Sequence, residues 1–381
     1  MKAGAVHFLL VLLFGLLYLP SLGFGFFAED SWYAALGFRD IPGAFMIGPD
    51  PTPHFRPLSY MTFPPVNAVA NSALAHRAIN LALFLGIVTL TVRRLGSGWT
   101  PALATAVVFS HPAFAYPVTW FSQRSDLILM LTLAWYSTAQ SNGLRITMLT
   151  LSTLARSPFV FQVLLSLRPA SRRSAGFLVP IAFGIVVLAV SWWFTFRPVS
   201  GQEGSTLFAR LDASFGGLVL GLAGRAVKIV EGLIYVFVPF PAVWGHWYVW
   251  PVTSTYAFLW GALFYLTIRA RALRINRDLA LGLTLAIPFA VNSELRVVAP
   301  AALFLSVGIF RWLGSAPSRA ATGILAGLLI LNLVSTLNVY RFADSGLPDS
   351  GGAECPRVEV PSNKWLCLRH GILERLIASA S

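Results

Sequence analysis

The sequence predicts an all-α polytopic membrane protein with roughly 9–13 transmembrane or re-entrant helices. Hydrophobic residues make up 56% of the chain and charged residues only 11%, and the mean hydropathy is +0.70. Apolar stretches of about 15 to 24 residues recur along the whole length, and a soluble domain cannot bury them. The 381 residues suffice for such a bundle and leave little for a separate soluble domain.

The charge of the chain indicates a topology rather than a nucleic-acid partner. The formal net charge is +13, and membrane proteins retain excess Lys and Arg on the cytoplasmic side. We therefore expect membrane lipids, and no nucleic acid, as partners. Lys2 precedes a first apolar run that lacks a small-residue cleavage site, which favours a signal-anchor helix with its N-terminus inside. Four basic clusters then mark cytoplasmic returns: Arg93 and Arg94; Arg168, Arg172 and Arg173; Arg269, Arg271, Arg274 and Arg277; Arg311 and Arg319.

Apolar runs between these clusters predict nine crossings. They lie at about 4–26, 74–92, 100–116, 126–141, 174–196, 252–268, 278–291, 298–313 and 320–337. Residues 1–337 then form one membrane module with a large first outer loop at about 27–73. Residues 338–381 form a short extracytoplasmic tail without a repeat pattern.

Two stretches do not fit a single crossing. Residues 146–168 begin and end on the cytoplasmic side and contain Pro158, which disfavours helix in the residue before it. They predict two short helices in a broken hairpin, and such backbone is tolerated at membrane depth only beside protein or a watery cavity. Residues 205–244 contain Arg225 and Lys228, and they favour a short hairpin or an amphipathic segment along the interface.

The most informative motif is "HPAFAYPVTWFSQRSDLILML", residues 111–131. It resembles the stretch His-Pro-Val-His-x-Glu-Ala-Val-Ala-Trp-Ile-Ser-Gly-Arg-x-Asp-Leu-Leu of the transmembrane and tetratricopeptide-repeat O-mannosyltransferases and their bacterial relatives, within the GT-C glycosyltransferase superfamily. Eight positions match in one ungapped register: His111, Pro112, Val118, Trp120, Ser122, Arg124, Asp126 and Leu127.

Three further motifs of that family have counterparts in the same order, over about residues 24–310. An Asp-Asp pair after the first helix resembles Glu29-Asp30, and an Arg-Pro-Leu motif resembles "HFRPLSYMTF" with Arg56. A Glu-Arg-Tyr-Leu-Tyr-Leu-Pro stretch resembles "SELRVVAP" with Glu294. The resemblance implies a GT-C-like bundle that consists of the membrane module alone. The departures from the family pattern are Phe114 for its second His, Tyr116 for Glu, Gln123 for Gly and "ARSPF" for an Ala-Lys-Glu stretch.

The resemblance implies an inverting transfer of a sugar, mannose by family analogy, from a polyprenyl-phosphate donor to a hydroxyl of a protein, lipid or glycan. Asp30 is the expected base and Glu29 the second choice. Adjacent helix positions do not share a face, so these acids are not a two-carboxylate glycosidase pair. Arginines suit the anionic leaving phosphate, and the candidates are Arg56, Arg124, Arg156 and Arg296. Other expected site-lining residues are His54, His111, Trp120, Asp126 and Glu294.

Each of these residues also has a structural interpretation. His111 can shape its loop, Arg124 and Asp126 can pair with other groups at a tight outer turn, and Arg156 can lie buried against Glu231. No cofactor is expected, and no Cys/His spacing fits a metal site, although a divalent cation at Glu29 and Asp30 stays open. Two cysteines of the outer tail, Cys355 and Cys367, are expected to form a disulfide in an oxidising compartment.

Two other function classes remain open. A secondary transporter also uses broken helices and intramembrane charges, but it is expected to show paired hydropathy halves, and none is evident. A non-catalytic lipid-binding scaffold is the second alternative. The compact length favours a bacterial inner-membrane enzyme with its site facing the periplasm.

Overall fold

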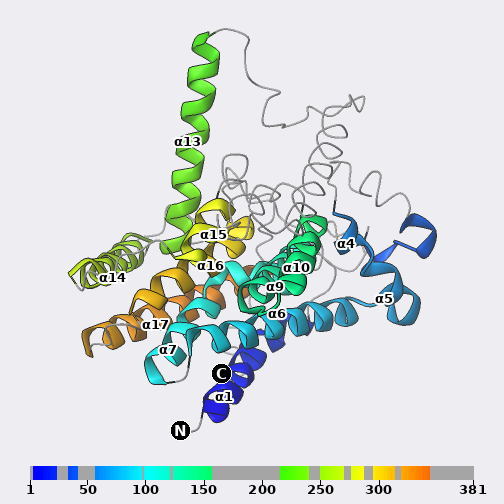
Figure 1. The fold of residues 1–381 in the computed structure, drawn as a ribbon, viewed down its shortest axis with the longest axis horizontal. Helices are drawn as coiled ribbons and strands as arrows, with labels where there is room; N and C mark the ends of the chain where they lie inside the picture. Colours follow the sequence, from blue (N-terminus) through cyan, green and yellow to red (C-terminus); the bar gives the residue numbers. More distant parts are fainter. Residues whose placement is uncertain are drawn as a thin grey trace, which may run out of the picture.

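The computed structural model describes ten segments of the chain, and every regular element in them is a helix (Figure 1). The absence of strands from these segments agrees with the all-α prediction. The described segments are residues 3–23, 33–41, 56–96, 98–120, 123–156, 215–239, 249–269, 276–286, 295–313 and 319–343.

The described residues form α-helices and a few short 3-10 helices. The α-helices are α1 (Ala3–Tyr18), α4 (Pro57–Tyr60), α5 (Phe63–Ala70), α6 (Ala73–Leu95), α7 (Trp99–Phe109), α8 (Ala115–Thr119), α9 (Arg124–Thr138), α10 (Asn142–Ala155), α13 (Phe215–Phe237), α14 (Val249–Arg269), α15 (Arg277–Leu285), α16 (Leu295–Leu313) and α17 (Arg319–Ala343). Short 3-10 helices are η1 (Leu19–Gly23), η2 (Phe38–Asp40) and η3 (Pro112–Phe114).

Three described helical segments are long and apolar enough to cross a membrane. They are Gly4–Gly23, Ala73–Leu95 and Arg319–Leu337. At about 1.5 Å per residue each approaches or exceeds the roughly 30 Å thickness of a hydrocarbon core. They coincide with the crossings predicted at 4–26, 74–92 and 320–337. Helix α17 continues to Ala343, past the predicted end of the membrane module.

One predicted crossing needs correction, and one of the two alternatives for residues 205–244, the short hairpin, is excluded. The crossing expected at 100–116 is interrupted, because α7 ends at Phe109 and His111 is extended, with φ −61° and ψ 128°. Pro112 disfavours helical backbone at residue 111 and lacks an N–H of its own. Within 205–244, residues 215–237 form one continuous helix rather than a short hairpin. Figure 1 shows this helix, α13, extending away from the other helices.

The broken hairpin is described in its first half only. Helix α10 ends at Ala155, and Arg156 is extended, with φ −156° and ψ 103°. This confirms the helix break before Pro158. The remainder of 146–168 and the crossing predicted at 174–196 lie outside the described residues.

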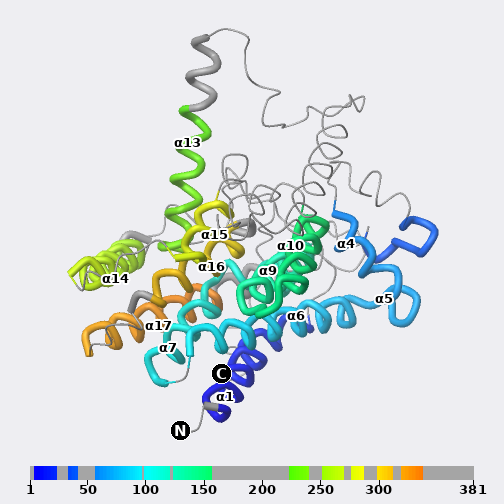
Figure 2. Tube along the Cα trace, viewed as in Figure 1, coloured from blue at the N-terminus to red at the C-terminus, as the bar shows by residue number. Residues whose placement is uncertain are grey.

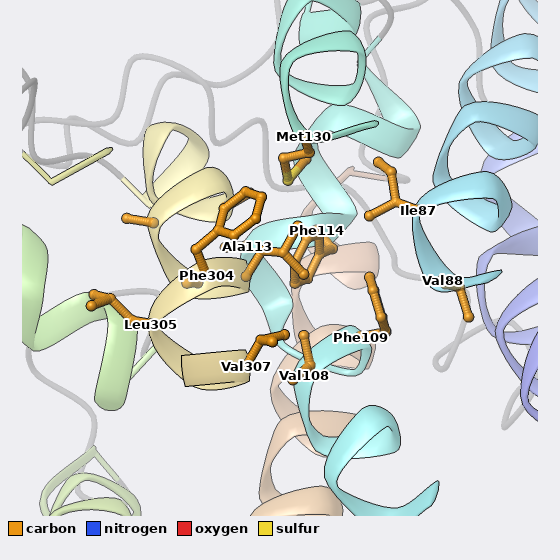
Figure 3. Close-up of a cluster of buried hydrophobic side chains, with 14 of the residues drawn as sticks. Ile87, Val88, Val108, Phe109, Ala113, Phe114, Met130, Phe304, Leu305 and Val307 are labelled. Carbon is orange, nitrogen blue, oxygen red and sulfur yellow. The ribbon is translucent and has the colours of Figure 1, made fainter. Parts of the chain in front are cut away.

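Apolar side chains from most of the described helices form the main core. Figure 3 shows Ile87 of α6, Phe109 of α7, Phe114 of η3, Met130 of α9 and Phe304 of α16 gathered between the helices. Aromatic rings in this core meet edge to face or tilted, with centroids 5.4 to 5.8 Å apart for the pairs that Phe109 and Phe114 make with each other and with Phe84.

Helix α6 connects the two ends of the bundle. Figure 2 shows it running from α4, α5 and α10 at one end towards α7 at the other. The link from α6 to α7 includes Gly96 and Gly98, whose φ values are +94° and +131°. Residues with a Cβ rarely adopt such values, so glycine permits this short connection.

Candidate functional site

Arg124, the first residue of α9, is the centre of a buried polar network at the end of the bundle where α6 begins. Its side chain is fully buried and its guanidinium lies 4.3 Å from the centre of the Phe63 ring. Nε donates to Asn80 Oδ1 at 2.8 Å, and Nη1 donates to the hydroxyl and carbonyl of Thr62 at 3.0 and 3.5 Å. Nη2 donates to the ring Nδ1 and carbonyl of His76 at 3.0 and 3.1 Å.

These contacts favour the structural interpretation of Arg124. A guanidinium carries five N–H groups, and here each has an acceptor in α6 or in the segment before α5. No N–H of Arg124 remains for a phosphate in this arrangement. In this arrangement Arg124 joins α9 to α6 and to the segment before α5, which agrees with the structural interpretation left open for it.

A chain of hydrogen bonds leads from Arg124 to the segment that follows the predicted catalytic acids. Because His76 Nδ1 accepts from Arg124, its Nε2 carries the proton and donates to Asn67 Oδ1 at 2.7 Å. Asn67 Nδ2 donates to the carbonyls of Tyr33 and Leu36 at 2.9 and 2.8 Å. The Tyr33 ring packs 4.8 Å from that of Phe63. Residues 33–36 are thus fixed to the same end of the bundle as Arg124.

Two more side chains of α6 hold the motif of residues 111–131 against it. Arg77 Nε donates to the carbonyl of Thr119 at 2.7 Å, and Asn80 Nδ2 donates to the carbonyl of Pro117 at 2.9 Å. Both side chains are fully buried. Trp120, the residue after Thr119, is buried at the end of α8. Its main-chain N–H donates to the carbonyl of Tyr116 at 2.8 Å.

A second group at this end contains two of the predicted phosphate ligands. Asp126, fully buried in the first turn of α9, forms an ion pair with Arg156 at the end of α10. Asp126 is thus a carboxylate partner of Arg156 in the described segments, where the sequence alternative had named Glu231. Arg56, at the start of α4, is 9% exposed and its Nη1 lies 3.5 Å from Ser125 Oγ.

Among the described residues, this group carries one positive charge in excess. Two guanidinium groups, of Arg56 and Arg156, accompany one carboxylate, and all three side chains are buried. Within the described segments, Arg56 Nε has no hydrogen-bond partner and its Nη1 contact is long. A buried cation with unsatisfied donors is costly unless an anion accompanies it. The arrangement is therefore suited to bind an anion.

His111 shapes its loop, as one interpretation of the sequence proposed. Its Nδ1 accepts from the main-chain N–H of Ala113 at 3.1 Å, and its Nε2 lies 3.1 Å from the carbonyl of Val236 in α13. Because Nδ1 is an acceptor, Nε2 is the donor in the second contact. Both ring nitrogens therefore contact main-chain groups, and His111 links η3 to α13.

The polar face of α6 was not predicted as part of the site. His76, Arg77 and Asn80 lie in the apolar run that predicts a crossing at 74–92. Residues four apart share a helix face, and polar side chains within an apolar run mark functional or structural contacts. That pattern was the available signal for His76 and Asn80.

Several predicted residues lie outside the described segments: Glu29, Asp30, His54, Glu294, Cys355 and Cys367. Arg296 belongs to α16, but its side chain is not described. No group of three or more His, Cys, Asp or Glu side chains in the described segments could hold a metal ion. Comparisons of the chain with models of protein families, with curated proteins and with solved structures give no match.

Proposed function

We propose that the protein is a polytopic GT-C-type glycosyltransferase that moves a sugar from a polyprenyl-phosphate donor to an acceptor hydroxyl. The observation that supports this most is the buried group of Arg56, Asp126 and Arg156. These residues come from three helices, are far apart in the sequence, and leave one positive charge in excess. A polyprenyl phosphate supplies the matching anion.

Arg56 is the proposed ligand of the donor phosphate. It is buried, and its Nε and Nη1 are poorly satisfied by the described residues. The phosphate departs as an anion when the sugar is transferred, so a cation that contacts it stabilises the developing charge. A guanidinium can do so with two parallel hydrogen bonds. In this proposal Arg156 contacts the same phosphate, and Asp126 holds the Arg156 side chain in position.

Asp30, with Glu29 as second choice, is the proposed base that takes the proton of the acceptor hydroxyl. Asp30 precedes Tyr33 by three positions in the sequence. The network from Arg124 through His76 and Asn67 ends on the carbonyl of Tyr33. In this proposal Arg124 helps to position the segment that follows the base. The acceptor oxygen attacks from the face opposite the phosphate, which inverts the configuration of the sugar.

The positive-inside rule sets the proposed orientation. Arg93 and Arg94 end α6, so this end faces the cytoplasm and the end with Arg124 faces outward. A bacterial inner membrane then places the site at the periplasmic surface. Mannose is the proposed sugar by family analogy, and the acceptor hydroxyl belongs to a protein, lipid or glycan.

Donor turnover by the purified full-length chain tests the proposal. The chain is held in nanodiscs and given labelled polyprenyl-phosphate sugars, and hydrolysis by water is counted with transfer so that the acceptor need not be known. Arg56→Gln is expected to lower turnover about 100-fold, the scale of one lost charge-stabilising contact. Arg39→Gln is the matched control, because Arg39 is 93% exposed and lies in the same predicted outer loop.

Three outcomes decide between the functions. Turnover that falls in Arg56→Gln and Asp30→Asn, but stays within about twofold in Arg39→Gln, supports the transferase with these roles. Equal turnover in Arg56→Gln and the wild type contradicts the assignment of Arg56. A folded wild-type chain that consumes none of the donors contradicts the transferase itself.

A further inference from the structure

A second buried charge cluster lies at the other end of α6. Asp278, in the first turn of α15, is fully buried and forms ion pairs with Arg94 of α6 and Arg311 of α16. Arg311 Nη1 lies 3.0 Å from Asp278 Oδ2. Two guanidinium groups pair with this one carboxylate and Arg277 adds a further cation nearby, so positive charge is in excess among the described residues of this cluster.

Close packing of α15 on α16 holds Asp278 in place. A Cβ added to Gly282 would lie 2.6 Å from the main-chain nitrogen of Leu305, and one added to Gly308 would lie 2.7 Å from that of Leu279. The helices can approach this closely because both positions are glycine. Asn276 Nδ2 also donates to the carbonyl of Gly308 at 2.8 Å.

The cluster borders a cavity of about 210 Å³ with both charged and apolar walls. Its lining includes Arg94, Arg311, Thr100, Ala104, Phe310 and Leu325. Arg311 is half-exposed, with 49% of its side-chain surface accessible, so the excess charge can be reached from outside.

The N-terminus of α7 adds to the positive potential of this cavity. The first N–H groups of a helix have no acceptor within it and carry a partial positive charge. Gly98 precedes α7, and it provides no side-chain acceptor for them. Thr100 belongs to this first turn and lines the cavity. Two arginines and a helix N-terminus together form a site for an anion, and phosphate groups fit such sites.

We propose that this cavity binds the phosphodiester headgroup of an anionic phospholipid. The apolar lining suits the glycerol and first acyl carbons, while Arg311 and the α7 N-terminus suit the phosphate. Trp99, beside the cavity in sequence, is 76% exposed, as is common for Trp at a membrane interface. Basic pockets between helices on the cytoplasmic side bind such headgroups. The inference rests on the membrane placement proposed above and not on the transfer reaction.

Lipid retention tests the proposal on the full chain. The protein is equilibrated with equal amounts of phosphatidylglycerol and phosphatidylcholine, transferred to mild detergent, and the retained lipids are counted by native mass spectrometry. The wild type is expected to retain phosphatidylglycerol preferentially. Arg311→Gln is expected to lower this retention about fivefold, the scale of one basic residue near an anionic lipid. It leaves Asp278 paired with Arg94 and removes one positive charge from the cavity wall.

Two further variants keep the test decisive. Arg319→Gln makes the same charge change at an exposed position of α17 that does not line the cavity, and it should stay within about twofold of the wild type. Thr100→Glu adds a negative charge to the cavity and should also lower retention. A carboxylate in the first turn of a helix is favourable, so this variant is expected to fold.

The opposite results would overturn the proposal. They are equal retention in Arg311→Gln and Arg319→Gln, or equal retention of the two lipids by the wild type. Displacement of the lipid by inorganic phosphate alone would assign the cavity to a soluble anion. Donor turnover measured on the same variants separates this site from the proposed transferase, since loss of lipid with intact turnover leaves the transferase standing.

Discussion

Two clusters, one near each end of α6, both combine a buried carboxylate with arginines but differ in their access to solvent. Each has one fully buried carboxylate in the first turn of a helix, Asp126 in α9 or Asp278 in α15, and two nearby arginines. At the Asp126 end both arginines are buried, whereas Arg311 at the Asp278 end is half-exposed. The buried arginines of the Asp126 cluster therefore suit a ligand that the protein encloses. The half-exposed Arg311 of the Asp278 cluster suits a ligand that enters from outside.

The separation of the clusters fits a membrane. His76, which bonds to Arg124 at the end with the Asp126 cluster, and Arg94 of the Asp278 cluster are 18 positions apart on α6, which corresponds to about 27 Å along the helix axis. A hydrocarbon core is roughly 30 Å thick. In the proposed placement the two clusters thus lie near opposite interfaces, where phosphate groups are found.

Removing each carboxylate is the largest perturbation and tests the difference in access. Asp126→Asn leaves Arg56 and Arg156 buried without an acid, and it should lower the free energy of unfolding by about 3–5 kcal/mol. Asp278→Asn should cost roughly half as much, because Arg311 can be hydrated where it is. Denaturant unfolding in detergent, followed by Trp fluorescence, measures both. Equal losses in the two variants would show that exposure does not distinguish the clusters.

Replacing the central arginine tests whether the Asp126 end is organised by Arg124. Arg124→Lys keeps the charge but loses the fork that reaches Asn80, Thr62 and His76, and it should cost about 2–4 kcal/mol of unfolding free energy. Combined with Asn67→Ala, the loss should fall short of the sum by about 1 kcal/mol, because both belong to one network. Additive losses would place Asn67 outside it.

A matched lysine variant controls for the change of side chain. Arg145 is half-buried on α10 and its Nε donates to the carbonyl of Ala139 at 2.9 Å. Among the described residues this bond joins Arg145 to the turn between α9 and α10 and not to the Arg124 network, so Arg145→Lys should cost under about 1 kcal/mol. A cost as large as that of Arg124→Lys would mean that any arginine of the bundle resists replacement.

Replacing a glycine at the contact of α15 with α16 tests the Asp278 cluster without changing the Asp126 cluster. Gly308→Ala places a Cβ against the backbone of Leu279, so it should lower the free energy of unfolding by about 1–3 kcal/mol. The separated helices should also weaken the contact of Asp278 with Arg311 and reduce retention of anionic lipid. Gly261→Ala in α14 is the control, because its added Cβ meets nothing within 4 Å, and it should be neutral or slightly stabilising.

The sequence predicted the continuous helices well because apolar length alone defines them. The crossings at 4–26, 74–92 and 320–337 correspond to helices long enough to span a membrane. The break after Phe109 was missed, since the residues on both sides are apolar and hydropathy does not respond to backbone geometry. Pro112 was the local signal, and it also marks the start of η3.

The site could be predicted only in part. Arg56 and Arg156 were identified as candidates, and they lie at one end of the bundle, next to Ser125 and Asp126. The sequence offered the structural role of Arg124 only as one of two alternatives and could not name its partners, because these acceptors, Thr62, His76 and Asn80, lie 44 to 62 positions away in the sequence. Such tertiary contacts decide which N–H groups of an arginine remain available for a ligand. Residue spacing in the sequence does not reveal these contacts.

The smallest expected effect concerns Arg311, the half-exposed arginine of the Asp278 cluster. Arg311→Gln leaves Asp278 with Arg94 as its partner, and a half-exposed ion pair contributes little after screening by water and salt. We expect a loss of unfolding free energy below about 1 kcal/mol, and a smaller one at high salt. Arg156→Gln, at the buried end, should lose several-fold more with little dependence on salt, because it leaves Asp126 buried without its paired cation. Unfolding of both variants at low and high salt checks this contrast. A large, salt-independent loss in Arg311→Gln would show that the exposed arginine holds the fold together, and its lipid phenotype could then no longer be attributed to the cavity.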